Sequence, residues 1–478
     1  MNLRKFIFNF AGAISVSLAG CSVGPNYKEP SFGAPAAWNE AQQKGVDTRA
    51  GELARWWTVF EDPLLNSLVE RAVQSNLDLR VAEARIREAR AVRAAATAGL
   101  WPALDTAGSY TRSRSSENAF NVPSQGGTGG GASGIKLERN FYNAGFDANW
   151  EIDVFGGVRR AVEAADATIE ATEYGRRDVL VTLLGDVARN YIDLRGAQRR
   201  LAVARANVKT QQDSLELTRV RFDAGLASDL DVARAEAQVN ATAAQIPNLE
   251  SATKEAAYSL DLLLGLAPGA LWHELEKELA IPTLPPEILV GLPSDLLRRR
   301  PDIRVAERRL AAATAQVGSA VADLFPKFFL TGLAGMESIS AGEWFTAGSR
   351  YWSIGPTIRW PIFDAGRIRA NIEIRSAQQE QALNQYEKTV LAALGDVEKS
   401  LVNYSQEQVR YRSLNDAVAA NRRAVAMAQE LYVRGLNDYL NVLDTQRALY
   451  VTETELAQSE ATMASNLVAL YKALGGGW

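Results

Sequence analysis

Cysteine and histidine are almost absent from this sequence, which contains one of each, Cys21 and His273. The residues after His273 lack the second histidine that a zinc-protease helix requires. A Ser-His-Asp triad or a His and Cys metal site therefore has almost no residues to draw on, and a single cysteine forms no disulfide within one chain. The sequence argues against an enzyme and predicts no metal or other cofactor.

A basic block is also missing. The chain carries 52 Lys and Arg against 56 Asp and Glu, a net charge of −4, so we expect no nucleic-acid partner. The glycines between 126 and 131 are not followed by a helix pattern, which favours a flexible loop over a phosphate cradle.

No apolar run is long enough for a membrane-spanning helix, which needs about 20 residues. The longest candidate, residues 6–16, follows Arg4 and Lys5 and ends in small residues before Cys21. This pattern predicts a signal peptide over residues 1–20 and a lipid on Cys21 as the new N-terminus. An ordinary signal peptide with an incidental cysteine is the alternative. Ser22, rather than Asp, suits retention in the outer membrane, and the mature chain keeps 50 Lys and Arg against 56 Asp and Glu.

The sequence repeats itself. Residues 150–265 return as 360–475 at a constant shift of 210, and residues 78–102 return as 302–326 at a shift of 224. Matched residues include Gly156 with Gly366 and Asp78 with Asp302. Two copies of about 200 residues are too long and too few for a solenoid. We therefore expect an internal duplication with five segments: 1–20, signal peptide; 21–63, acylated arm and equatorial segment; 64–265, first repeat; 266–292, equatorial linker; 293–478, second repeat.

Each repeat predicts two strands after an opening helix. The helices are expected at 64–98 and 293–322, and the strand pairs at 103–113 with 142–152 and at 327–337 with 352–362. Residues 142–152 and 352–362 alternate between an apolar and a polar face, with aromatic residues toward the ends, as transmembrane β-strands do. The edge of a soluble β-sandwich is the alternative. Residues 115–138 and 338–349 would then be extracellular loops.

Proline is absent from 157–224 and from 366–434, which are rich in Ala, Leu, Val, Arg and Glu. Such composition predicts helices about 100 Å long. Each run ends at a glycine turn, Gly225 or Gly435, after which we expect a returning helix of about 40 residues. Apolar periodicity of this length indicates coiled-coil packing. Arg298, Arg299 and Arg300 precede Pro301 and are interpreted as part of a structural kink.

Four strands per chain require partners. An open sheet edge is not tolerated in lipid, because its backbone groups would stay unpaired. Two copies would give eight strands and a filled interior, whereas three would give twelve and a pore. The pattern alone therefore predicts an oligomeric duct without fixing the number of subunits.

Four motifs carry a family resemblance. They begin at Cys21-Ser22-Val23-Gly24-Pro25, at Trp56-Trp57-Thr58-Val59-Phe60, at Leu297-Arg298-Arg299-Arg300-Pro301 and at Leu431-Tyr432. With these motifs the mature chain resembles the TolC-like outer-membrane efflux proteins, most closely the lipoprotein branch represented by OprM and NodT. The resemblance implies an α+β membrane protein: a homotrimer with a twelve-stranded transmembrane β-barrel continued by a long periplasmic coiled-coil α-barrel. It also implies a periplasmic adaptor and an inner-membrane RND-type pump as partners, in a tripartite system that exports small molecules.

The resemblance also implies roles for particular residues. The adaptor-docking tips would be Arg221, Gly225 and Leu226 in the first turn and Arg434, Gly435 and Leu436 in the second. Asp444 would belong to an acidic ring at the periplasmic gate, where Asn441 replaces a second carboxylate and Asp231 and Asp438 compensate. Tyr432 would tie neighbouring helices together in the closed state. Two other interpretations stay open: a type I protein-secretion channel and a lipid-anchored periplasmic scaffold without a pore.

Overall fold

The computed structural model describes residues 22–31, 33, 35–40, 46–47, 53–116, 138–285 and 288–478. The predicted signal peptide, Cys21 and the glycine cluster at 126–131 lie outside these ranges. The chain divides into two compact units, which are described separately. Unit 1 comprises residues 1–29, 87–169 and 308–383, and unit 2 comprises 30–86, 170–307 and 384–478.

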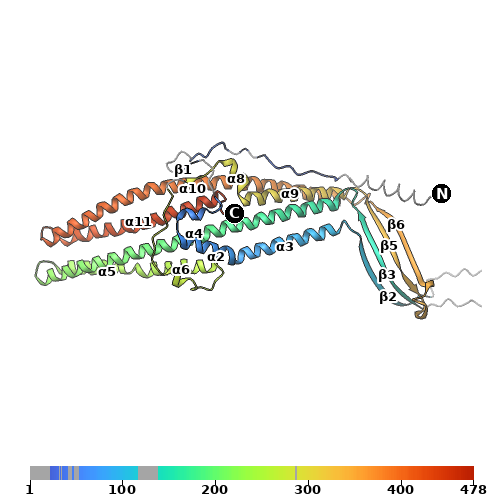
Figure 1. Cartoon of the computed structure of the whole chain (residues 1–478), viewed down its shortest axis with the longest axis horizontal. Helices are drawn as coiled ribbons and strands as arrows, with labels where there is room; N and C mark the ends of the chain where they lie inside the picture. The colour runs from blue at the N-terminus through green and yellow to red at the C-terminus, as the bar shows by residue number, and fades with distance from the viewer. Residues whose placement is uncertain are drawn as a thin grey trace, which may run out of the picture. The chain divides into compact units, whose positions relative to one another are not determined.

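Unit 1 contains a four-stranded antiparallel sheet. Its strands, β2 (Ala103–Arg114), β3 (Glu138–Ile152), β5 (Lys327–Ser338) and β6 (Arg350–Arg359), lie in the order β2-β3-β5-β6 (Figure 1). The four predicted strands are therefore confirmed. β6 ends earlier than expected, because its partner β5 begins at Lys327, which lies opposite Arg359. Residues 360–362 follow the strand instead of completing it.

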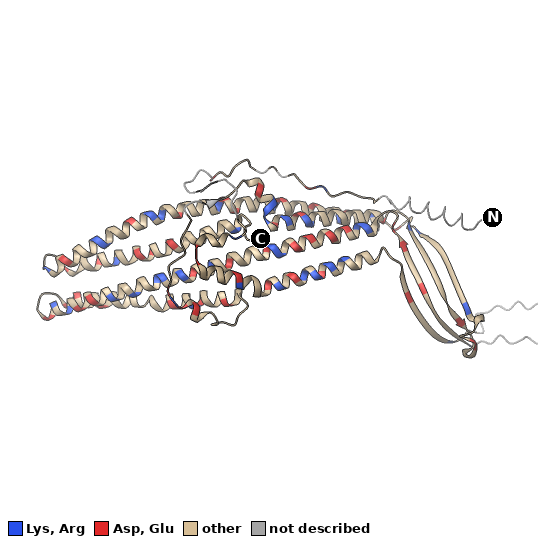
Figure 2. Cartoon of the chain, viewed as in Figure 1, with Lys and Arg blue, Asp and Glu red and all other residues tan. Residues whose placement is uncertain are grey.

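The even-numbered residues of β6 form an exposed apolar row. Trp352, Ile354 and Ile358 are 76%, 69% and 63% exposed in the single chain. Figure 2 draws the strands mostly in tan and the helices with both charge signs along their length. Large apolar side chains exposed along one sheet face are suited to contact with lipid rather than water.

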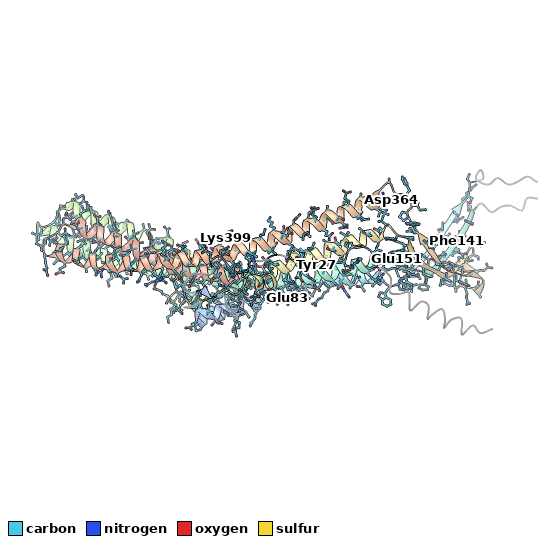
Figure 3. The ribbon with its side chains drawn as sticks, turned by 90° about the horizontal axis from the view of Figure 1, so that it is seen from above. Tyr27, Glu83, Phe141, Glu151, Asp364 and Lys399 are labelled. Carbon is cyan, nitrogen blue, oxygen red and sulfur yellow. The ribbon has the colours of Figure 1, made fainter. Side chains whose placement is uncertain are left out.

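The segment after Cys21 packs on the rest of unit 1. The Val23 amide donates to the Phe155 carbonyl (3.2 Å), and the Arg160 guanidinium donates to the Val23 carbonyl (3.2 Å) and to the Asn26 side chain (2.6 Å). Arg308 lies 5.4 Å from the ring centre of Tyr27, which Figure 3 labels. Residues 23–27 are thus held by both backbone and side-chain contacts.

Two long helices follow the strand pairs. α4 (Gly157–Asp223) and α10 (Arg367–Val433) each contain 67 residues. Asp364, labelled with the β3 residue Glu151 in Figure 3, accepts from the Ile368 amide (2.9 Å) and so satisfies a backbone donor at the start of α10. The long proline-free helices predicted from the sequence are confirmed.

The returning helices differ between the repeats. α11 (Tyr439–Ala473) is continuous, but the first hairpin returns as α5 (Asp229–Ala243) and α6 (Ile246–Leu263). The prediction of one long returning helix is wrong for this hairpin. Pro247 lies in the first turn of α6, where its missing N–H costs nothing, and inside a continuous helix it would remove a hydrogen bond.

The opening helices are also divided. Residues 64–98 form α2 (Pro63–Ser75) and α3 (Leu77–Ala98), and residues 293–322 form α8 (Pro293–Arg299) and α9 (Pro301–Ala322). The first break is unexpected, and its cause is Asn76, whose side chain accepts from the Leu79 amide (3.0 Å) and donates to the Leu263 carbonyl (2.9 Å). The kink at Pro301 is confirmed.

Unit 2 has the main hydrophobic core. Trp56 and Phe60 of the 3₁₀ helix η1 (Trp56–Phe60) are each 1% exposed, and Trp56 stacks on Tyr471 of α11 at 5.5 Å. The short elements α7 (Trp272–Leu275), β1 (Val46–Asp47) and β4 (Ile288–Leu289) also belong to this unit, where β1 and β4 pair in parallel. The tryptophan motif of the sequence is therefore a core element.

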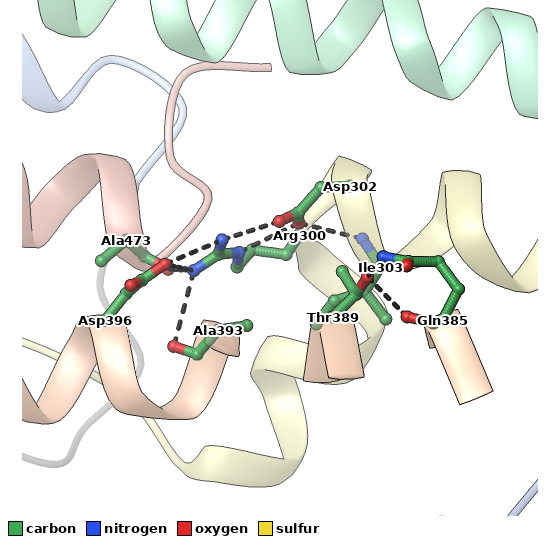
Figure 4. Close-up of polar contacts among 8 residues, drawn as sticks. All are labelled: Arg300, Asp302, Ile303, Gln385, Thr389, Ala393, Asp396 and Ala473. Atoms are coloured by element: carbon green, nitrogen blue, oxygen red, sulfur yellow. Dashed lines mark hydrogen bonds and ion pairs between the residues drawn. The ribbon is translucent and has the colours of Figure 1, made fainter. Parts of the chain in front are cut away.

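Arg300 holds the break between α8 and α9 (Figure 4). Its guanidinium donates to Asp302 (2.7 Å), Asp396 (3.3 Å) and the Ala473 carbonyl at the end of α11 (3.2 Å). Burial on its own would lower the pKa of Arg300. The hydrogen bonds and negative charges of Asp302 and Asp396 outweigh this effect, so the pKa lies above its ordinary value. The structural interpretation of this arginine is confirmed.

Candidate functional site: the tips of the helix hairpins

Both helix hairpins turn in the same way. The Leu226 amide donates to the Arg221 carbonyl (2.7 Å), and the Leu436 amide donates to the Leu431 carbonyl (2.9 Å). Gly225 and Gly435 have φ of +74°, the left-handed backbone that favours glycine. These are Schellman turns, which satisfy the last carbonyls of a helix. They leave Leu226 and Leu436 66% and 72% exposed, and large apolar side chains exposed at both tips are suited to contact with a partner.

A buried aromatic cluster lies next to the turns. The Tyr432 hydroxyl faces the Thr218 hydroxyl of α4 at 3.5 Å, and the Arg221 guanidinium lies 4.6 Å from the Tyr432 ring centre. Arg221 also donates to the Val433 carbonyl (3.2 Å). Tyr439 packs edge-on against Tyr432 at 5.7 Å, and burial raises the pKa of Tyr439 to about 12. Residues of both turns thus tie α4, α10 and α11 together.

The acidic residues beside the turns are engaged in helix capping. Ser228 and Asp231 form a capping box at the start of α5, with the serine hydroxyl 2.7 Å from the carboxylate. Asp438 caps α11 by accepting from the Asn441 amide (3.3 Å) and from the Asn441 side chain (2.9 Å). These contacts give Asp231, Asp438 and Asn441 local structural roles. Arg434, directly after α10, forms an ion pair with Glu430 of that helix.

Asp444 differs from these residues. It lies one turn into α11, is exposed, and has no hydrogen bond or ion pair with any residue in the described ranges. Its carboxylate is therefore available to solvent and to ions. The structure brings Tyr432 and Arg221 together, but it does not place Asp444 in contact with the other predicted gate residues.

A polar seam between the hairpins was not anticipated from the sequence. Along it, Gln446 donates to Ser214 (2.8 Å) and Asn207 donates to Glu453 (3.1 Å), joining α11 to α4. Arg447 donates to Gln238 of α5 (2.6 Å). Four polar residues of α4 are buried at a spacing of four, three and four residues: Asn207, Gln211, Ser214 and Thr218. That heptad-like spacing of polar residues is the signal that would have located the seam.

Two further observations concern membrane-spanning helices and metal ligands. No helix among the described residues is both long and apolar enough to span a membrane. Within the same ranges, no group of three or more His, Cys, Asp or Glu side chains is placed to hold a metal ion.

Known structures and sequences share this architecture. The outer-membrane channel OprN superposes with a TM-score of 0.88 at 38% identity, covering 96% of this chain and 100% of that one. Nodulation protein T of Rhizobium leguminosarum bv. trifolii is 34% identical, with 97% of this chain and 96% of the relative covered. The toluene efflux pump outer membrane protein TtgI of Pseudomonas putida is 34% identical, with 96% of each covered.

A four-stranded sheet joined to two long helix hairpins thus defines the subunit of an outer-membrane channel. The sequence pattern of the family described as "Outer membrane efflux protein" matches residues 68–266 and again 292–476. The chain belongs to this family, whose members are efflux channel proteins of the outer membrane. The predicted family and the predicted function as an outer-membrane efflux channel are confirmed.

Proposed function

We propose that three copies of this chain close a twelve-stranded β-barrel in the outer membrane and continue it as a periplasmic coiled-coil α-barrel. The observation that carries this proposal is the open sheet, whose outer strands β2 and β6 each have one unpaired edge within the described chain. In lipid, each unpaired backbone group costs several kcal/mol. Four strands are too few to close on themselves, since about eight form the smallest barrels.

The cargo of this duct is a set of small molecules. TtgI is named for toluene efflux, and this chain aligns with it over nearly its whole length. A periplasmic adaptor and an inner-membrane RND-type pump would deliver the cargo. The exposed Leu226 and Leu436, with Arg221 and Arg434 beside them, offer the adaptor two similar tips per chain.

A lipid on Cys21 anchors each chain. Arg160 supports this part of the proposal, because its hydrogen bonds to residues 23 and 26 hold the segment that follows Cys21 on the rest of unit 1. Residues 1–20 would be removed as a signal peptide, and the two repeats at 64–265 and 293–478 would each supply one strand pair and one helix hairpin to the channel.

The gate lies at the helix tips. Asp444 is the carboxylate that three chains would bring around one axis, where like charges concentrate a negative potential. Asp231 and Asp438 contribute less, because their oxygens already accept hydrogen bonds from helix caps. Tyr432 and Arg221 hold the helices behind the gate.

Gel migration and conductance test the proposal together. The full-length chain extracted in detergent should run as an SDS-resistant trimer, shift to monomer on boiling, and conduct ions in a planar bilayer. A monodisperse monomer that needs no detergent would overturn the channel assembly. A stable trimer without conductance would favour a scaffold without a pore.

A further inference from the structure

The two hairpins of the sheet have one and the same register. The shifts of 224 and 210, set by residue matches alone, carry β2 onto β5 and β3 onto β6. Under these shifts the pair Ala103 and Asn149 becomes Lys327 and Arg359, which are partners in the second hairpin. All ten pairs between β5 and β6 arise in this way from pairs between β2 and β3. The repeat therefore extends to the hydrogen-bonding partners of each strand.

The pairing between the two repeats has no counterpart within one chain. β3 of the first repeat pairs with β5 of the second, for example Asp147 with Leu333. The same shifts carry β3 onto β6 and carry β5 back onto β2. These are the two outer strands, which lie at opposite edges of the sheet and do not pair with each other. The counterpart must therefore form between two copies of the chain.

We propose that β6 of one chain pairs with β2 of the next in the register that these shifts dictate. Asp147 and Leu333 then become Thr357 and Ser109, so Thr357 of one copy lies opposite Ser109 of its neighbour. Likewise Ala144 and Met336 become Ile354 and Arg112, and Tyr142 and Ser338 become Trp352 and Arg114. This inference rests on the proposed closed oligomer and adds its residue-by-residue seam.

The side chains are compatible with this register. Directly opposed residues lie on the same face of a sheet, and a slip of one residue would move every side chain of a strand to the other face. In the proposed register, even-numbered residues of β6 lie opposite even-numbered residues of β2. The exposed apolar row of Trp352, Ile354 and Ile358 therefore continues onto one face of β2. That face carries Leu104 and Tyr110, which are 68% and 56% exposed. Trp352 lies opposite Arg114, a pair that gains from cation–π attraction.

Disulfide cross-linking between introduced cysteines tests the register. The variant Thr357→Cys with Ser109→Cys, oxidised in the full-length membrane-embedded protein, should form covalent dimers and trimers that survive boiling in SDS without reductant. Directly opposed Cβ atoms lie about 4.5–5.5 Å apart, close to the disulfide range. The pairs Thr357→Cys with Ala107→Cys and Thr357→Cys with Thr111→Cys keep the same face but are slipped by two residues, about 7–8 Å apart, and should not cross-link.

Two controls define the background. Neighbouring opposed pairs in an antiparallel sheet alternate between a longer and a shorter Cα–Cα distance. The variant Ile358→Cys with Gly108→Cys therefore tests the same register at the other spacing and on the other face. The single variants Thr357→Cys and Ser109→Cys measure any cross-linking through Cys21.

The outcomes separate the register from the oligomer. Cross-linking of either slipped pair in place of the matched pairs would overturn the register while leaving the trimer standing. An SDS-resistant trimer in which none of the pairs cross-links would overturn pairing between β6 and β2. Loss of the trimer in the unmodified protein would instead refute the proposed assembly itself.

Discussion

Asp444 is the residue on which the proposed ion selectivity depends most directly. Replacing it in Asp444→Asn removes one negative charge per chain from the proposed gate. We expect cation selectivity and block by divalent cations to fall, more strongly at low salt because salt screens the interaction. Reversal potentials in a planar bilayer measure the change, and Asp416→Asn, an exposed aspartate elsewhere on α10, is the matched control. A shift with Asp231→Asn but not with Asp444→Asn would assign the gate to the first hairpin.

Asn441 bears on why the proposed gate would have a single carboxylate at this turn. Its side-chain amide donates to the Asp438 carboxylate that caps α11. An aspartate at 441 would place two carboxylates at hydrogen-bonding distance, where like charges repel. Residue 441 can therefore support the cap at Asp438 as an asparagine or add a second carboxylate to the proposed gate as an aspartate, but it cannot do both.

Glu460 predicts a pH dependence of stability. It lines a cavity of about 710 Å³ with Arg199 and Tyr411. Burial raises the pKa of Glu460, and Arg199 opposes this only partly. A raised folded-state pKa means that the charged carboxylate weakens the fold above that pKa, and that the penalty disappears as the pH falls below the unfolded value. Glu460→Gln should therefore raise the melting temperature of the protein at pH 8 by a few degrees, a gain of at most about 1 kcal/mol because solvent screens the charge of a partly buried group.

The pH series distinguishes titration from packing. The difference in melting temperature between Glu460→Gln and the unmodified protein should shrink toward pH 4. The exposed Glu387→Gln should show no such trend. An advantage of Glu460→Gln that stays constant across pH would assign it to packing instead.

At the scale of elements, periodicity and composition located most of the fold. Alternation identified β3 and β6 clearly and their partners β2 and β5 less clearly, and the absence of proline identified α4 and α10. The breaks were harder to foresee. Pro247 marked the start of α6 but was not used, whereas Asn76 carries no general breaker signal, because its effect depends on the Leu263 carbonyl that only the tertiary fold brings near it.

Some residues of the candidate site could likewise be located from the sequence, whereas others could not. Gly225 and Gly435 were located because a left-handed turn requires glycine, and the structure places both there. The sequence predicts Asp231 and Asp438 as gate residues, and the structure adds that both cap the start of a helix. The polar seam at Ser214 and Gln446 was missed, since a buried serine inside a long helix resembles a solvated one until its partner on α11 is known.

The segment 22–29 gives a prediction at the same scale. Arg160→Ala removes the donors that hold Val23 and Asn26, and the side chain it removes is only 4% exposed. We expect the Val23 amide, bonded to the Phe155 carbonyl, to exchange its hydrogen much faster while the strands stay protected. Hydrogen–deuterium exchange of the detergent-solubilised protein measures this, with the exposed Arg367→Ala as control. Unchanged protection at Val23 would mean that the segment is held by packing alone.

For the whole molecule, the strand topology fixes which loops face outward. The connection from β5 to β6 lies at the opposite end of these strands from the ends that continue into α9 and α10, so residues 338–349 should be extracellular, and the proposed channel would place both helix tips in the periplasm. Gly342→Cys should therefore react with a membrane-impermeant thiol reagent on intact cells. Leu436→Cys should react only after the outer membrane is permeabilised, and it is preferred to a cysteine at Gly435, whose φ of +74° disfavours a side chain. The unmodified protein controls for Cys21, which has no free thiol once acylated. Labelling of Leu436→Cys but not Gly342→Cys on intact cells would invert the topology, and with it the assignment of the helix tips to the adaptor and the gate.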